Sequence, residues 1–203
     1  KSTKFLPPNY HLARTMNMAE PRTVVWLNLA AIPLLILFGW LFGRIVGAFN
    51  SSSPTISMIW ASLTTFSIRN LVGIIISILF MLVLHELIHW AFFGLFTHEI
   101  PRFALKSGYA FAAAPEWYVP KYQYIIVGLS PLIIISILSI VFGALINSFF
   151  ISYIVLIAAL NAAGALGDII VVVWVSIQTN HLFVNDQGDI FTTYTLQDEV
   201  LSE

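Results

Sequence analysis

The sequence contains no cysteine and very few charged residues. Without cysteine the chain forms neither disulfides nor thiolate metal sites, so histidine and the carboxylates are its only strong candidate metal ligands. Only 9% of the 203 residues are charged, against about 25% in a typical soluble protein, which excludes an ordinary soluble globular protein. The net charge is -1, so the chain lacks the basic surface that nucleic-acid binding needs, and we expect no nucleic-acid partner.

Hydrophobic residues make up 59% of the chain and gather in four runs. A helix needs roughly 20 apolar residues to cross a bilayer, and each run reaches that length: 24–49, 71–96, 122–150 and 152–178. The sequence therefore predicts an all-α polytopic membrane protein with four transmembrane helices in contact with the lipid bilayer. Its expected parts are a polar N-terminal arm at 1–22, a transmembrane domain at 23–178 and an acidic tail at 179–203.

The distribution of positive charge indicates the orientation. Seven of the nine Lys and Arg residues lie in the N-terminal arm or in the loop at 97–121, whereas the opposite side has only Arg44 and Arg69. Because Lys and Arg accumulate in cytoplasmic loops, we expect both termini and this loop to be cytoplasmic.

The same loop contains a predicted β-hairpin. Two short segments within residues 103–112 flank Ser107-Gly108, a pair of residues that favours a turn between strands. An isolated hairpin is marginally stable in water. We therefore expect this short hairpin, between the second and third transmembrane helices, to be associated with the membrane.

Ionisable residues inside the apolar runs are the strongest functional signal. An acidic residue at the centre of a membrane helix costs roughly 2.5–3.5 kcal/mol on insertion scales, so such residues rarely persist without a task. The second run contains His85, Glu86 and His89, the H-E-x-x-H pattern. On a helix, His85 and His89 are neighbours on one face and can bind one Zn²⁺, while Glu86 lies close enough to act as general base on a zinc-bound water.

Asp168 in the fourth run is the candidate third ligand, since a catalytic zinc usually has three protein ligands and an open position. At 1.5 Å per residue, His85, His89 and Asp168 all lie roughly 10–17 Å from the expected cytoplasmic boundary. The small residues at 162–167 would allow the close helix approach that a shared metal requires.

Other polar and helix-bending residues have weaker assignments. Asn161 precedes Asp168 by two helical turns on the same face, so we expect it to hydrogen-bond a ligand or a substrate backbone. Gly128 and Pro131 are expected to kink or loosen the third helix near its cytoplasmic end. The remaining histidines lie at or beyond the membrane boundaries and are expected to be solvated or interfacial: His11, His98 and His181.

The same residues have structural interpretations. The two histidines and Glu86 could form a buried polar cluster without metal, and Asp168 could be the partner of a serine or a backbone group. Asn161 could serve only as an interhelical hydrogen-bonding residue.

With His85, Glu86, His89 and Asp168 in these positions, the chain resembles the site-2 protease group of intramembrane zinc metalloproteases. Within that group it is most similar to a family of small bacterial zincin peptidases, and the resemblance covers roughly residues 70–180. The resemblance implies that His85, His89 and Asp168 are zinc ligands and that Glu86 is the catalytic base. It also implies an active site near the cytoplasm, a location in the bacterial cytoplasmic membrane and membrane-embedded protein or peptide substrates.

The chain departs from this group around the third ligand. The group's usual motif has Asn, prolines and then Leu-Asp-Gly, whereas here Gly167 precedes Asp168 and Ile169 follows it. The proline-rich bend is therefore missing. The hairpin at 103–112 stands where related enzymes have a membrane-associated strand pair, which by analogy could pair with an unwound substrate strand.

These observations favour an intramembrane zinc endopeptidase with its core at about 70–178. The alternative is a metal-binding membrane scaffold or pseudoprotease that holds a partner without cleaving it. A metal-ion transporter is disfavoured because the first and third runs have almost no polar residues to line a path.

Overall fold

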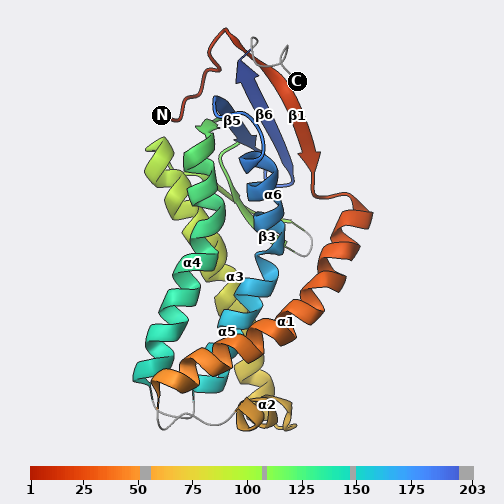
Figure 1. The fold of residues 1–203 in the computed structure, drawn as a ribbon, viewed down its shortest axis with the longest axis vertical. Coiled ribbons are helices and arrows are strands. Elements are labelled where there is room, and N and C mark those ends of the chain that lie inside the picture. Colours follow the sequence, from red (N-terminus) through yellow and green to blue (C-terminus); the bar gives the residue numbers. More distant parts are fainter. Residues whose placement is uncertain (51–55, 107–108, 147–149, 197–203) are drawn as a thin grey trace. The chain divides into compact units, whose positions relative to one another are not determined.

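The computed structural model describes residues 1–50, 56–106, 109–146 and 150–196 (Figure 1). Three of its helices are long and apolar enough to cross a membrane: α1 (Pro21–Phe49), α3 (Ile68–Thr97) and α4 (Lys121–Leu145). A short helix, α2 (Ile56–Thr64), lies between α1 and α3. The first three apolar runs therefore form helices, as expected, and their length and composition are compatible with a multi-pass membrane protein. Helix α4 ends at Leu145 and does not reach Phe150.

The fourth apolar run forms two helices, α5 (Ile151–Gly164) and α6 (Leu166–Ser176), which meet at an angle of 41°. Counted as one broken span, the pair brings the number of candidate membrane spans to four. The expected single helix at 152–178 is therefore corrected to a helix pair. The break falls at Ala165, inside a stretch rich in Gly and Ala, and sharp bends without proline are typical of such small-residue sequences.

A four-stranded antiparallel sheet combines one strand near the N-terminus, one from the middle of the chain and two near the C-terminus. Its strands run in the order β1-β6-β5-β4, with the bounds β1 (Tyr10–Asn17), β4 (Tyr118–Pro120), β5 (Leu182–Asp186) and β6 (Ile190–Leu196). Gly188, at φ 94°, allows the tight turn between β5 and β6. The expectation of an all-α protein is therefore wrong: the protein is mostly helical with a small antiparallel sheet.

A second, two-stranded sheet pairs β2 (Arg102–Lys106) with β3 (Tyr109–Ala113). These strands occupy the segment expected to form a hairpin. The Ser107-Gly108 turn lies outside the described residues. The association of this hairpin with the membrane remains a prediction.

The chain divides into two compact units. The first contains residues 1–27, 86–130 and 167–203, and the second contains 28–85 and 131–166. The core of the first unit joins helix and sheet residues: Phe93, Ala114, Val119, Tyr124, Val127, Val171, Val175, Leu182, Val184 and Phe191. The core of the second unit is helical: Phe42, Val46, Ile59, Ile151, Val155, Ala158 and Ala162.

Within the first unit, a buried lysine fixes the beginning of α4 to the end of α6. The Lys121 ammonium donates hydrogen bonds to the carbonyls of Ser176, Gln178 and Thr179 at 2.9, 2.6 and 3.2 Å. The last carbonyls of a helix have no partner within the helix and carry partial negative charge, so a cation stabilises them. This contact helps to position α6, which carries Asp168.

Candidate metal centre

The H-E-x-x-H residues lie within the unbroken helix α3, so His85 and His89 are one turn apart. His89 is buried at 7% exposure, whereas His85 and Glu86 are partly buried. Along α3, Leu, Ile, Val and Phe residues surround the motif on both sides.

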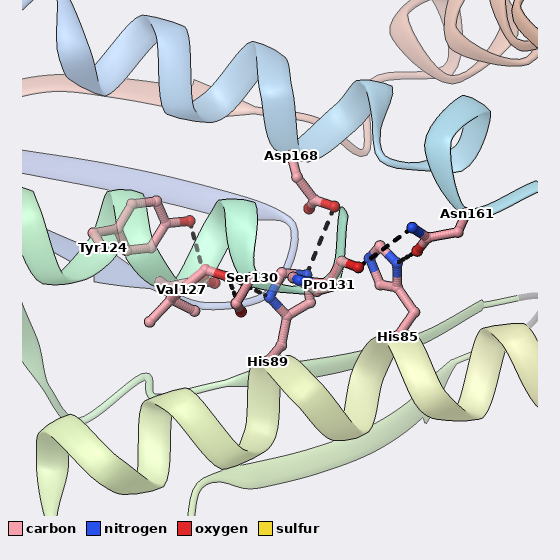
Figure 2. A network of polar contacts seen from close by, with 9 residues as sticks. His85, His89, Tyr124, Val127, Ser130, Pro131, Asn161 and Asp168 are labelled. Carbon is pink, nitrogen blue, oxygen red and sulfur yellow. Dashed lines mark hydrogen bonds and ion pairs between the residues drawn. The ribbon is translucent and has the colours of Figure 1, made fainter. Parts of the chain in front are cut away.

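The His89 ring is held through its Nδ1 atom (Figure 2). Nδ1 lies 3.0 Å from the carbonyl oxygen of Val127 in α4. A carbonyl can only accept, so the hydrogen must be on Nδ1, and in the neutral tautomer of this kind the electron pair of the second ring nitrogen is on Nε2. A histidine ligand is usually oriented in this way, by a hydrogen bond from its other ring nitrogen.

The Val127 carbonyl is available because of Pro131. In a regular helix the N–H of residue 131 would donate to the carbonyl of residue 127, but proline has no N–H. The Ser130 hydroxyl also donates to this carbonyl, at 2.8 Å. The proline that was expected to loosen α4 therefore leaves α4 intact from Lys121 to Leu145 and supplies an acceptor for His89.

The His85 ring is held through Nδ1 as well. Its partner is the Asn161 side-chain oxygen in α5, at 3.0 Å, and the Asn161 amide nitrogen donates to the Pro131 carbonyl at 3.3 Å (Figure 2). Because the Pro131 carbonyl only accepts, the amide nitrogen must face it and the amide oxygen must face His85. Asn161 is fully buried, and its side chain fixes the orientation of the His85 ring. A contact of Asn161 with a ligand or a substrate remains a prediction.

Asp168 lies in the first turn of α6, where a carboxylate is favoured by the helix dipole. Its Oδ2 atom lies 3.6 Å from His89 Nε2, too far for a hydrogen bond. Close packing of α4 and α6 allows this approach, since a Cβ added at Gly128 would lie 2.5 Å from Val172 Cγ2. Val172 follows Asp168 by one helical turn.

His85, His89 and Asp168 each offer one ligand atom, and these atoms all lie within 4.8 Å of one another. No other group of three or more such residues is found in the described part of the chain. Within that part, His11, His98 and His181 therefore belong to no candidate metal site. Two imidazoles and a carboxylate are a donor set that catalytic zinc sites use. The residues therefore fit zinc, and the separation of 3.6 Å is near the roughly 3.3 Å expected between two ligands of a tetrahedral zinc.

Glu86 occupies the position next to His85 on α3 and is partly buried. Its assignment as general base, like the assignment of the three ligands, remains a prediction.

A buried hydrogen-bonded pair near the start of α4, Tyr124 and Asp186, was not predicted from the sequence. The Tyr124 hydroxyl donates to Asp186 Oδ2 at 3.0 Å, and the Gly188 N–H donates to Asp186 Oδ1 at 2.7 Å. Burial raises the pKa of Asp186 to about 6, although these two hydrogen bonds act to lower it. The pair connects the turn between β5 and β6 to α4, one turn before Val127.

Sequence reasoning also missed the Val127 and Pro131 carbonyls. A signal for the first was present, because a proline inside a helix leaves the carbonyl four residues earlier without its usual donor.

A family model described as "Putative zincin peptidase" matches residues 78–182, just over half of the chain. The chain belongs to this family. The matched segment of this zincin peptidase includes His85, Glu86, His89, Asn161 and Asp168. Family membership supports a zinc-dependent metallopeptidase. Comparisons with curated proteins and with solved structures found no match.

Proposed function

We propose that this zincin peptidase is an intramembrane zinc endopeptidase that hydrolyses peptide bonds in membrane-embedded substrates, with Glu86 as general base. The observation that carries the proposal is the orientation of the two histidine rings by hydrogen bonds to their Nδ1 atoms. Both rings direct Nδ1 to a fixed acceptor, so the electron pair that a metal would use is on Nε2 of each neutral ring, and Asp168 Oδ2 lies 3.6 Å from Nε2 of His89.

His85, His89 and Asp168 would hold the zinc. Asn161 and the Val127 carbonyl keep the two rings in place and raise the basicity of the ligating nitrogens. When bound, zinc supplies Lewis-acid chemistry, polarising a carbonyl and lowering the pKa of water.

Glu86 handles the proton in this proposal. Its carboxylate accepts a proton from the attacking water and returns it to the leaving amine nitrogen. Apolar residues of α3 surround the motif, and low-dielectric surroundings strengthen the electrostatic interactions of the site with the developing charge on the scissile carbonyl oxygen.

The test compares zinc-loaded wild type with Glu86→Gln in detergent, using solubilised bacterial membrane proteins as substrates and mass spectrometry of new N-termini as readout. Glu20→Gln, in an exposed position outside the match, is the matched control. We expect new N-termini within or beside transmembrane segments with wild type and Glu20→Gln, and none with Glu86→Gln at equal zinc content. If wild type and Glu86→Gln give the same termini, the protein is a metal-binding scaffold or pseudoprotease.

A further inference from the structure

A recess of about 200 Å³ lies in the first unit, where α3 ends and the β2–β3 hairpin begins. Its walls combine apolar surfaces with two carboxylates: Ile100, Pro101, Pro115, Trp117, Glu99 and Glu116. The Trp90 indole N–H donates to the Pro101 carbonyl at 3.2 Å, which fixes this wall to α3. The volume is below the roughly 300–1,000 Å³ of pockets that take whole drug-sized ligands, and so it suits a single side chain.

A cationic side chain of the protein already contacts two of these walls. Lys4 Nζ lies 2.7 Å from Glu99 Oε1 and 5.3 Å from the centre of the Trp117 ring. A carboxylate together with an aromatic face is the environment that selects an ammonium or guanidinium group. The hydrogen bond from Lys4 also holds the pKa of Glu99 below its ordinary value, so Glu99 is a carboxylate at neutral pH.

The contact that Lys4 makes is easily exchanged. The Lys4 and Glu99 side chains are 38% and 51% exposed, and exposed ion pairs contribute little stability. The N-terminal segment has its own attachment, since the backbones of Thr3 and Tyr118 exchange hydrogen bonds at 3.1 and 2.8 Å. Lys4 can therefore release Glu99 while the segment stays in place.

We propose that this recess is a subsite for a Lys or Arg side chain that flanks the membrane span of a substrate, and that Lys4 pairs with Glu99 in its wall until a substrate arrives. This inference rests on the proposed function. Thr97 in the recess wall follows His89 by eight residues on α3, about 12 Å along the helix. Membrane proteins concentrate Lys and Arg at the cytoplasmic ends of their spans, the side on which the charge distribution places this loop. A span positioned for cleavage then brings its flanking basic residue within reach of Glu99 and Glu116.

The test measures binding, so it does not depend on cleavage. The protein is zinc-loaded Glu86→Gln in detergent, and the probe is a fluorescent peptide of 20 Leu and Ala residues flanked at both ends by two Lys. A second peptide has Gln in place of each Lys. Fluorescence anisotropy is recorded for Lys4→Gln, Glu99→Gln, Glu116→Gln and Lys1→Gln, the last removing the same charge from an exposed position in the same segment.

We expect Lys4→Gln to tighten binding of the Lys peptide by up to about fivefold, the effect of removing an exposed competing ion pair, without changing the Gln peptide. Glu99→Gln and Glu116→Gln should each weaken the Lys peptide, and Lys1→Gln should change neither. A Trp117→Phe variant, which keeps an aromatic face, should retain the preference.

Equal binding of the two peptides by every variant would overturn the proposal and leave the Lys4–Glu99 pair as a local attachment. The proposal also fails if both peptides bind alike and the protein binds phosphatidylcholine vesicles better than phosphatidylglycerol vesicles, with this difference lost in Glu99→Gln. The recess would then take a lipid headgroup. If the preference for Lys appears while no substrate is ever cleaved, the recess is supported and the protease function is not.

Discussion

Helix α4 and the pair α5–α6 both contribute residues around the candidate metal centre, but they depart from a regular helix in opposite ways. Helix α4 has Pro131 in its interior and still runs unbroken over 25 residues. The pair α5–α6 has no proline and bends by 41°. A proline in a membrane helix thus need not mark a break, and the lack of one does not exclude a break.

The two departures serve different parts of the site. In α4 the missing N–H of Pro131 leaves the Val127 carbonyl for His89. In α5–α6 the break places Asn161 near the end of one helix and Asp168 in the first turn of the next. The residue that orients His85 and the candidate ligand Asp168 therefore belong to separate helices, and the expectation that they share one helix face is wrong.

The largest effect should follow from adding a methyl group to α4, by Gly128→Ala. Its Cβ would lie 2.5 Å from Val172 Cγ2. Valine has one strongly preferred rotamer in a helix, so we expect α6 to shift and carry Asp168 away from His89. We expect a loss of about 1–3 kcal/mol of stability from overpacking, measured by thermal unfolding in detergent, together with weaker zinc binding.

The matched control is Gly164→Ala at the end of α5, where an added Cβ meets nothing within 4 Å. It should keep zinc binding, and it should raise stability by up to about 1 kcal/mol through helix propensity. Combining Gly128→Ala with Val172→Ala should recover part of the loss. Equal effects of the two glycine substitutions would show that close packing of α4 and α6 does not position Asp168.

Pro131→Ala should change stability and zinc affinity in opposite directions. The new N–H competes with His89 for the Val127 carbonyl, so zinc affinity should fall by about tenfold, the effect of losing a hydrogen bond that orients a ligand. Helix stability should rise or stay the same, because a proline in a helix interior is unfavourable. Zinc affinity is measured by competition with a chelating dye.

Pro33→Ala is the control for this prediction, since Pro33 lies inside α1, a helix that carries none of the three candidate ligands. It should leave zinc affinity unchanged. Unchanged affinity in Pro131→Ala would mean that the freed carbonyl does not orient His89.

The smallest of these effects concerns the sheet residue that contacts the start of α4. Burial raises the pKa of Asp186 from 3.8 to about 6, so between about pH 4 and 6 the folded protein keeps a proton that the unfolded chain has lost. The stability that protonated Asp186 confers is full below about pH 4 and is lost as the pH rises through about 6.

Asp186→Asn removes this titration while an amide can still pair with Tyr124 and Gly188. We expect its unfolding midpoint to vary less between pH 4.5 and 7.5 than that of wild type, and to exceed the wild-type midpoint at pH 7.5. Parallel pH profiles of the two proteins would contradict the assignment.

The helices were predictable because a membrane span leaves a local signature in the sequence. The apolar runs identify α1, α3 and α4, and the cost of ionisable residues in apolar runs singles out His85, His89 and Asp168, the group whose ligand atoms lie within 4.8 Å of one another. Both signals depend only on residue type and spacing.

The sheet and the break in the fourth span were not predictable in this way. Strand β1 pairs with β6 from the opposite end of the chain, with Tyr10 opposite Leu196, and no local pattern indicates a contact over that sequence separation. The break at Ala165 has no proline to mark it. Backbone acceptors such as the Val127 carbonyl are invisible in composition, although Pro131 four residues later was a usable clue.

Metal content by mass spectrometry on detergent-purified protein tests the central claim most directly. The account predicts about one zinc per chain in wild type, in Glu86→Gln and in the control His181→Ala, and loss of zinc in His85→Ala, His89→Ala and Asp168→Ala. Two results would contradict a site built from these three ligands: the absence of metal from wild-type protein that was never exposed to a chelator, or the persistence of zinc in Asp168→Ala.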